Sequence, residues 1–162
     1  MFKTIEELLG MPSSRVGFKN IVEFEHRRAG KLIRKGRSKN LVVNGGLDWL
    51  KGLMSNGGSG QALYIGCSAA TITPSASDTA LSGELTTNGF ARAAAAYAAG
   101  GTGVFTLQVT FTATGTQTVA SAGLFTALAG GVLFAEVPLS TSASLVSGDT
   151  LQITWTVTLT GS

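Results

Sequence analysis

The sequence predicts a mainly β protein: an antiparallel β-sandwich, jelly-roll-like, with one short helix and an N-terminal arm. Two stretches, residues 105–112 and 151–160, alternate large apolar side chains with Thr and Gln. Successive side chains of a strand point to opposite faces, so both stretches are half-buried strands, and a second layer must cover their apolar side. The predicted core residues are Phe105, Leu107, Val109, Phe111, Ile153, Trp155 and Val157.

Glycine supplies the third observation, because 22 of the 162 residues are Gly and many of them separate short apolar stretches. Short strands between such turns are typical of sandwiches, and about eight strands are expected when a hairpin at 18–43 is included. The other expected strands are Ala62–Cys67, Phe90–Ala99, Val104–Thr114, Val119–Thr126, Val132–Leu139 and Thr150–Leu159.

The chain is expected to have two parts. Residues 1–17 form an N-terminal arm with a short helix at Thr4–Leu9, and residues 18–162 form the β-sandwich domain, including the hairpin at 18–43. Asn44–Met54 has the apolar spacing of a helix, and Ser77 or Asp78 is placed to cap one further helical turn. No apolar stretch is long enough to cross a membrane, and the N-terminus does not resemble a secretory signal.

Charge is concentrated in the first 40 residues, which carry ten Lys or Arg against four Asp or Glu. Three interpretations stay open: a solvated hairpin whose charges discourage edge pairing, an arm that meets an acidic protein surface, and a nucleic-acid contact. The last is the least favoured, because no aromatic residues are interleaved with the cations. The candidate partner-binding residues are Arg27, Arg28, Lys31, Arg34, Lys35, Arg37 and Lys39.

The sequence offers no set of residues for catalysis. One His and one Cys cannot build a His-rich metal site or a Cys–His dyad within the chain, and His26 is expected to have a structural or surface role. Cys67 is expected to be a small buried hydrophobe, in a protein made in a reducing compartment. The acids after residue 40 look scattered, and turns explain Asp78 and Asp149. We therefore expect no enzyme activity, no metal and no cofactor.

Five segments form a recognisable series along the chain: Asn40–Leu47, Tyr64–Ser68, Pro74–Leu81, Ser121–Phe125 and Asp149–Thr156. Taken together they resemble a family of small structural proteins of tailed bacteriophages, described as tail or minor virion proteins. The resemblance covers about residues 40–160, and Gly66-Cys67-Ser68 stands where the family usually has Gly-Thr-Gly. It implies a place in the virion, after synthesis in the cytoplasm of the bacterial host.

Four functions remain open at this point. The first expectation is a capsid decoration (cement) protein, held by its arm and a sandwich surface against major capsid or tail proteins, in many copies or as a homo-oligomer. The second is a tail, collar or fibre-associated structural protein. The third is a carbohydrate-binding adhesin module, for which Trp49, Tyr64 and Tyr97 are the candidate aromatic residues. The fourth is a nucleic-acid binder acting through the basic hairpin.

Overall fold

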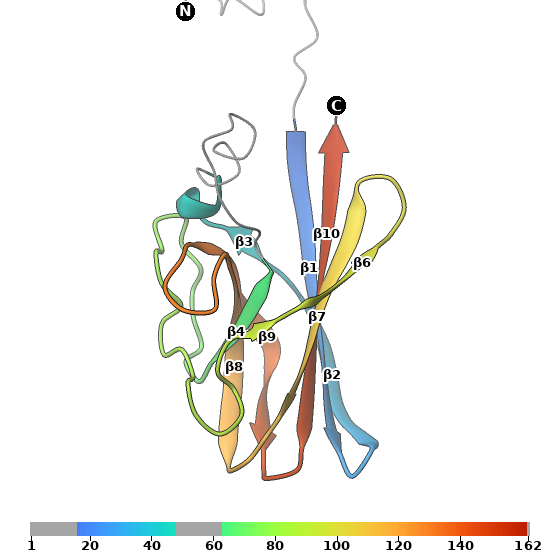
Figure 1. Cartoon of the computed structure of the whole chain (residues 1–162), viewed down its shortest axis with the longest axis vertical. Helices are drawn as coiled ribbons and strands as arrows, with labels where there is room; N and C mark the ends of the chain where they lie inside the picture. The colour runs from blue at the N-terminus through green and yellow to red at the C-terminus, as the bar shows by residue number, and fades with distance from the viewer. Residues whose placement is uncertain (1–15, 48–62, 162) are drawn as a thin grey trace, which may run out of the picture.

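The computed structural model describes residues 16–47 and 63–161, which form two antiparallel sheets packed face to face (Figure 1). This confirms the predicted sandwich. The first sheet has the order β2-β1-β10-β7-β6, made of β1 (Val16–Arg28), β2 (Lys31–Lys39), β6 (Ala96–Ala99), β7 (Val104–Thr112) and β10 (Thr150–Gly161). The second has the order β3-β9-β8-β4-β5, made of β3 (Leu41–Val42), β4 (Tyr64–Ser68), β5 (Ala93–Ala94), β8 (Gln117–Phe125) and β9 (Leu133–Leu145).

The first and last strands of the described chain lie side by side in the middle of the first sheet (Figure 1). Their antiparallel register runs from Val16 opposite Gly161 to Arg27 opposite Thr150. The sheet therefore depends on contacts between residues that are far apart in the sequence.

The main core lies between the two sheets and is centred on Trp155, which is fully buried. Of the predicted core residues, Phe105 is partly buried and the other six are buried. The opposite face of β7 and β10 carries Thr and Gln, as the alternation predicts. There Gln108 Nε2 donates to Thr154 Oγ1 at 2.9 Å, so cross-strand hydrogen bonds reinforce the polar face.

The chain passes directly from one sheet to the other at two corners of the sandwich. One corner is Asn40, between β2 and β3, and the other is Ala95, between β5 and β6. The single strand expected at Phe90–Ala99 is therefore wrong, because β5 pairs with β4 whereas β6 pairs with β7. Small alanine side chains can follow either sheet, and the Ala95 N–H donates to the Leu63 carbonyl at 2.7 Å where the chain turns.

The predicted helix begins at residue 44, directly after Val43. The Leu47 N–H donates to the Val43 carbonyl at 3.2 Å, while the Asn44 N–H donates to the Ala76 carbonyl at 2.7 Å. The rest of this helix and the helix expected at Thr4–Leu9 lie outside the described residues. Among the described residues, no helix is long and apolar enough to span a membrane.

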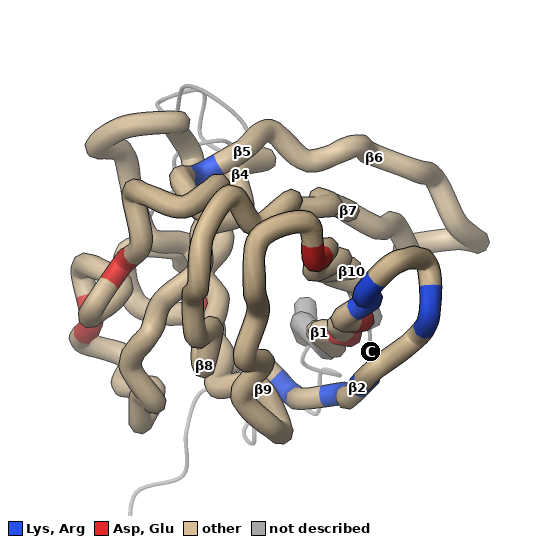
Figure 2. Tube along the Cα trace, turned by 90° about the horizontal axis from the view of Figure 1, so that it is seen from below, with Lys and Arg blue, Asp and Glu red and all other residues tan. Residues whose placement is uncertain are grey.

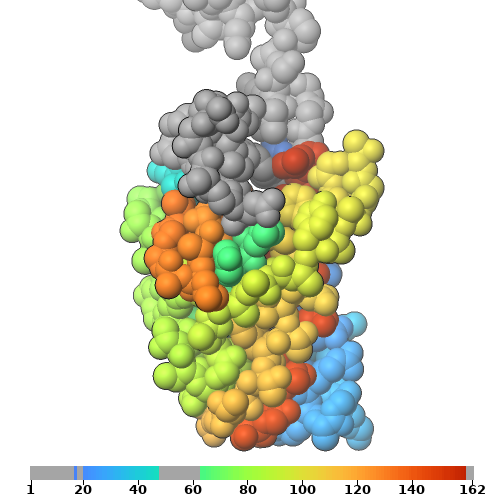
Figure 3. All heavy atoms as spheres, viewed as in Figure 1, coloured from blue at the N-terminus to red at the C-terminus, as the bar shows by residue number. Residues whose placement is uncertain are grey.

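A long connection between β4 and β5 covers the outer face of the second sheet (Figure 3). The helical turn expected from Ser77 or Asp78 is wrong. Instead, the Asp78 side chain accepts the Ser75 N–H at 2.9 Å, and the Asp78 N–H donates to the Ser75 carbonyl at 3.1 Å, which closes a turn. Beneath this connection lies a second, smaller apolar cluster, formed by Val43, Leu81, Phe125 and Leu133.

Candidate functional site

The basic residues gather on the β1–β2 hairpin, at one edge of the first sheet (Figure 2). The hairpin turns at Ala29 and Gly30, whose φ angles of 45° and 78° are both positive, as in the tight turns that suit the right-handed twist of paired strands. Because β2 is an edge strand, its outward side chains are available to another molecule.

Two of the seven predicted cations fasten the hairpin to the rest of the fold. Arg28 donates from Nε and Nη2 to the two carboxylate oxygens of Asp149, each at 2.9 Å. Arg34 donates from Nη1 to the carbonyl of Ser142 on β9. Arg34 therefore ties the edge of the first sheet to the second sheet, and Arg28 ties the end of β1 to the turn between β9 and β10.

Two further cations pair with acids of β1. Arg27 lies 2.8 Å from Glu25, and Arg37 lies 3.5 Å from Glu23. All four side chains are at least one-third exposed, so these pairs contribute little to stability. They do, however, neutralise part of the positive charge of the hairpin.

Three lysines remain, Lys31, Lys35 and Lys39, which we call the lysine face. They are exposed and make no ion pair within the described residues. They follow the exposed edge strand β2. Lys35 and Lys39 lie opposite Glu25 and Ile21, whereas a register shift between His26 and Arg27 leaves Lys31, opposite Arg28, on the other side of the strand. Ile33, at the register shift, is 51% exposed. Leu32 is also 42% exposed at this end of the hairpin. Apolar side chains among unpaired cations are more typical of a contact surface than of a purely solvated strand.

His26 is buried and takes part in the same cluster as Arg28. Its Nε2 lies 2.8 Å from Asp149 Oδ2, and the Val146 N–H also reaches Oδ2 at 3.1 Å. Hydrogen bonding from Arg28 holds the pKa of Asp149 well below its usual range, against the effect of burial. The sequence suggested that Asp149 lies in a turn. Its contact with His26 joins residues that are 123 positions apart, so no local sequence pattern could predict it.

A second charged pair, Arg92 with Glu84, lies at the connection between β4 and β5. Arg92 donates to Glu84 and lies 3.5 Å above the ring of Phe125, whereas Cys67 is buried and its thiol pKa is raised by that burial. Glu136, expected to stand alone, lines a pocket with Asp78. In the part of the chain that the structure describes, no group of three or more His, Cys, Asp or Glu is suited to a metal ion.

The candidate glycan-binding aromatics do not form a common site within the described residues. Tyr97 is 62% exposed on β6 and packs against Phe105, with 5.7 Å between ring centroids. Tyr64 is half-buried against the smaller apolar cluster. Trp49 lies outside the described residues.

Comparison with known proteins shows which family the chain belongs to. Residues 51–160, about two thirds of its length, match the protein family described as podophage GP4 fiber I protein gp80. No curated protein matches, and no solved structure matches. The family match confirms the resemblance to structural proteins of tailed phages and implies a place in the virion. The chain belongs to the family of the podophage GP4 fiber I protein gp80.

Proposed function

We propose that this protein is a non-enzymatic structural component of a phage tail fibre, or of the tail parts to which a fibre attaches. The observation that carries this proposal is the family match, since the matched residues include every strand from β4 to β9 and most of β10. The family description names a fibre protein, and this favours the fibre over the capsid surface.

The arrangement of polar groups supports a structural role. A catalytic site needs a nucleophile or base that is free to meet a substrate. Here the buried His26 and Asp149 hold each other and Arg28, and Glu84 holds Arg92. These contacts stabilise loops and strand ends, which is what a virion part requires.

We further propose that the lysine face attaches the protein to an acidic surface of a neighbouring virion protein. Unpaired lysines steer an acidic partner by long-range attraction, and the exposed Leu32 and Ile33 supply apolar area to bury once contact is made. Arg34 contributes indirectly, because it ties β2 to β9. Nucleic acid remains the least favoured partner.

Reconstitution tests the location. Purified protein with a fluorescent label is mixed with phage tails and, separately, with DNA-filled heads, both prepared from particles that lack this protein. Binding to tails alone supports the fibre role. Binding to heads alone overturns the fibre role in favour of capsid decoration. Without that result, capsid decoration stays a prediction from the sequence.

A matched pair of variants tests the attachment surface. Lys31, Lys35 and Lys39 are replaced with Gln in one variant, and in the control the exposed Thr86, Thr112 and Ser144 are replaced with Glu. Both changes lower the net charge equally, but only the first alters the lysine face. We expect the first variant to lose binding and the control to keep it. Equal binding by both variants would show that the lysine face is only solvated.

Salt gives an independent readout of the same surface. Attachment by lysines should weaken as salt rises toward about 1 M, where the screening length falls to about 3 Å. Attachment that does not change with salt would point to an apolar contact elsewhere on the sandwich.

A further inference from the structure

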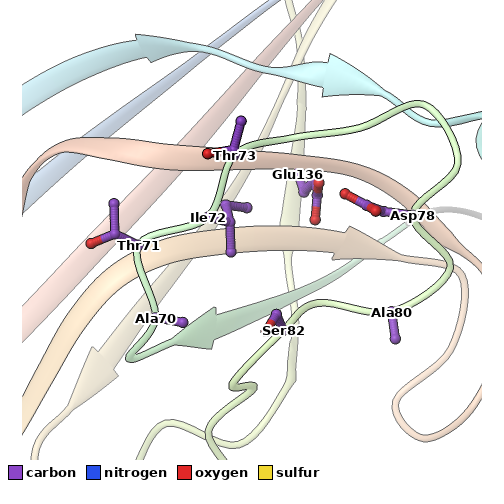
Figure 4. Close-up of a pocket in the computed structure, with 8 residues that line it drawn as sticks. All are labelled: Ala70, Thr71, Ile72, Thr73, Asp78, Ala80, Ser82 and Glu136. Carbon is purple, nitrogen blue, oxygen red and sulfur yellow. The ribbon is translucent and has the colours of Figure 1, made fainter.

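A pocket of ≈ 320 Å³ lies on the outer face of the second sheet, beneath the connection between β4 and β5 (Figure 4). Its polar lining comes from the hydroxyl side chains of Thr71, Thr73 and Ser82 and from the carboxyl groups of Asp78 and Glu136. It is separate from the lysine face, which lies on the first sheet.

Glu136 is unusual because it is a buried acid without a balancing cation. Its neighbours Ala135 and Val137 point into the main core, so Glu136 points away from it, into the space beneath the connection. The residue is only 1% exposed, and Oε1 has no hydrogen-bond partner. A buried carboxylate in this state is costly unless something binds it.

Asp78 lies on the other side of the pocket, and the two carboxyl groups point toward each other (Figure 4). The turn at 75–78 holds Asp78 in place, since the Ser75 N–H donates to Asp78 Oδ2 at 2.9 Å. Within the described residues, neither acid forms an ion pair with Lys, Arg or His. Burial and the neighbouring Asp78 raise the pKa of Glu136 to about 7, because two carboxylates this close resist ionising together.

We propose that this pocket binds a hard divalent cation, for which Ca²⁺ is the probe, with Asp78 and Glu136 as its charged ligands. Ca²⁺ takes six to eight oxygen ligands in flexible geometry, so water that enters the pocket can complete the set. The cation would supply the partner that Glu136 Oε1 lacks and would cancel the repulsion between the two acids. The pocket lining contains no aromatic side chain on which a sugar could stack, so a cation fits its chemistry better.

The position of the two acids gives the cation a structural consequence. Asp78 belongs to the covering connection, whereas Glu136 belongs to β9. The Asn44 N–H also donates to Ala76 in the same turn, so the start of the helix is tied to this connection. A bound cation would therefore fasten the covering layer to the second sheet and stabilise the folded chain.

The test measures thermal unfolding of the full chain at about pH 8, where Glu136 is largely ionised, with either a chelator or Ca²⁺ present. We expect the midpoint to rise in Ca²⁺, and to rise further with the logarithm of its concentration above the dissociation constant. Titration calorimetry should show one site per chain. At about pH 5 the rise should shrink, because protons then compete with the cation.

Three variants decide where the cation binds. Glu136→Gln and Asp78→Asn each remove one charge while keeping nearly the same shape, and Asn can still accept the Ser75 N–H. Both should abolish the calcium-dependent shift. Glu23→Gln makes the same chemical change on the exposed face of the first sheet and should keep the shift.

Two results would contradict calcium binding at this pocket. A folded parent chain with no shift and no binding heat at about pH 8 would overturn the proposal and leave the two acids as a pair that shares a proton. A shift that survives in Glu136→Gln, or that sodium chloride of equal ionic strength reproduces, would overturn it as well. None of these results depends on whether the protein belongs to the fibre or the capsid.

Discussion

His26 Nε2 lies 2.8 Å from Asp149 Oδ2, and this contact ties β1 to the turn between β9 and β10. Both side chains are buried, at 3% and 1% exposure. Arg28 reaches the same carboxylate from the end of β1. One acid therefore holds the hairpin and the last turn of the sandwich together.

Asp149→Asn should destabilise the fold by about 1–3 kcal/mol, because it removes the buried carboxylate on which His26, Arg28 and the Val146 N–H converge. Asn keeps the size of the side chain but cannot accept from His26, Arg28 and Val146 as a carboxylate does. Chemical denaturation of both chains measures the difference. Glu25→Gln, at an exposed pair, is the control and should cost less than about 1 kcal/mol. Equal losses for the two variants would refute the role of the cluster.

The same variant should change the response to acid. The pKa of Asp149 is lowered in the folded state, so its contribution to stability is present above the unfolded value of about 4 and is lost as the pH falls below it. The parent chain should therefore lose stability below about pH 4 more steeply than Asp149→Asn. Denaturation midpoints measured from about pH 5 to about pH 2 test this.

Glu136→Gln should have the opposite pH dependence when a chelator is present. The pKa of Glu136 is raised to about 7 in the folded state, so its contribution is full below about pH 4.5 and is lost as the pH rises through 7. The loss amounts to at most about 3 kcal/mol. The uncharged Gln variant should equal or exceed the parent in stability at about pH 8. A parent that is equally stable at both ends of this range would contradict the prediction.

Trp155→Ala should cost about 3–5 kcal/mol, since the indole is fully buried between the sheets and its removal leaves a cavity. Thr156→Ala changes the next residue of β10, on the polar face, and should cost less than about 1 kcal/mol. Denaturant midpoints for the two variants give the comparison. A larger loss for Thr156→Ala would mean that a partner or a second copy covers the polar face.

A chain that begins at Val16 should keep a cooperative unfolding transition. Residues 16–47 and 63–161 already contain both sheets and the main core. The division into an arm at 1–17 and a sandwich from 18 onward remains a prediction, which this truncation tests. Loss of cooperative unfolding would assign residues 1–15 to the folded body, whereas weaker binding to tails with unchanged stability would assign them to attachment.

The sequence by itself predicted which side chains of β7 and β10 face the core, the burial of Trp155, the basic hairpin and the phage family. These features are local, since the period of two in a strand is visible in a few neighbouring residues. The Gly-rich turns also located most strands to within a few residues.

Only the tertiary structure decided which distant residues meet. The alternation of side chains does not say which strand lies beside β1. An alanine-rich segment also gives no sign of which side chains face the core, so the division of residues 93–99 between two sheets followed from closure of the sandwich. The Asp78 side chain closed its own turn instead of capping a helix. His26 with Asp149, and Asp78 with Glu136, became neighbours because packing two sheets and a covering connection brings together side chains that no local pattern links.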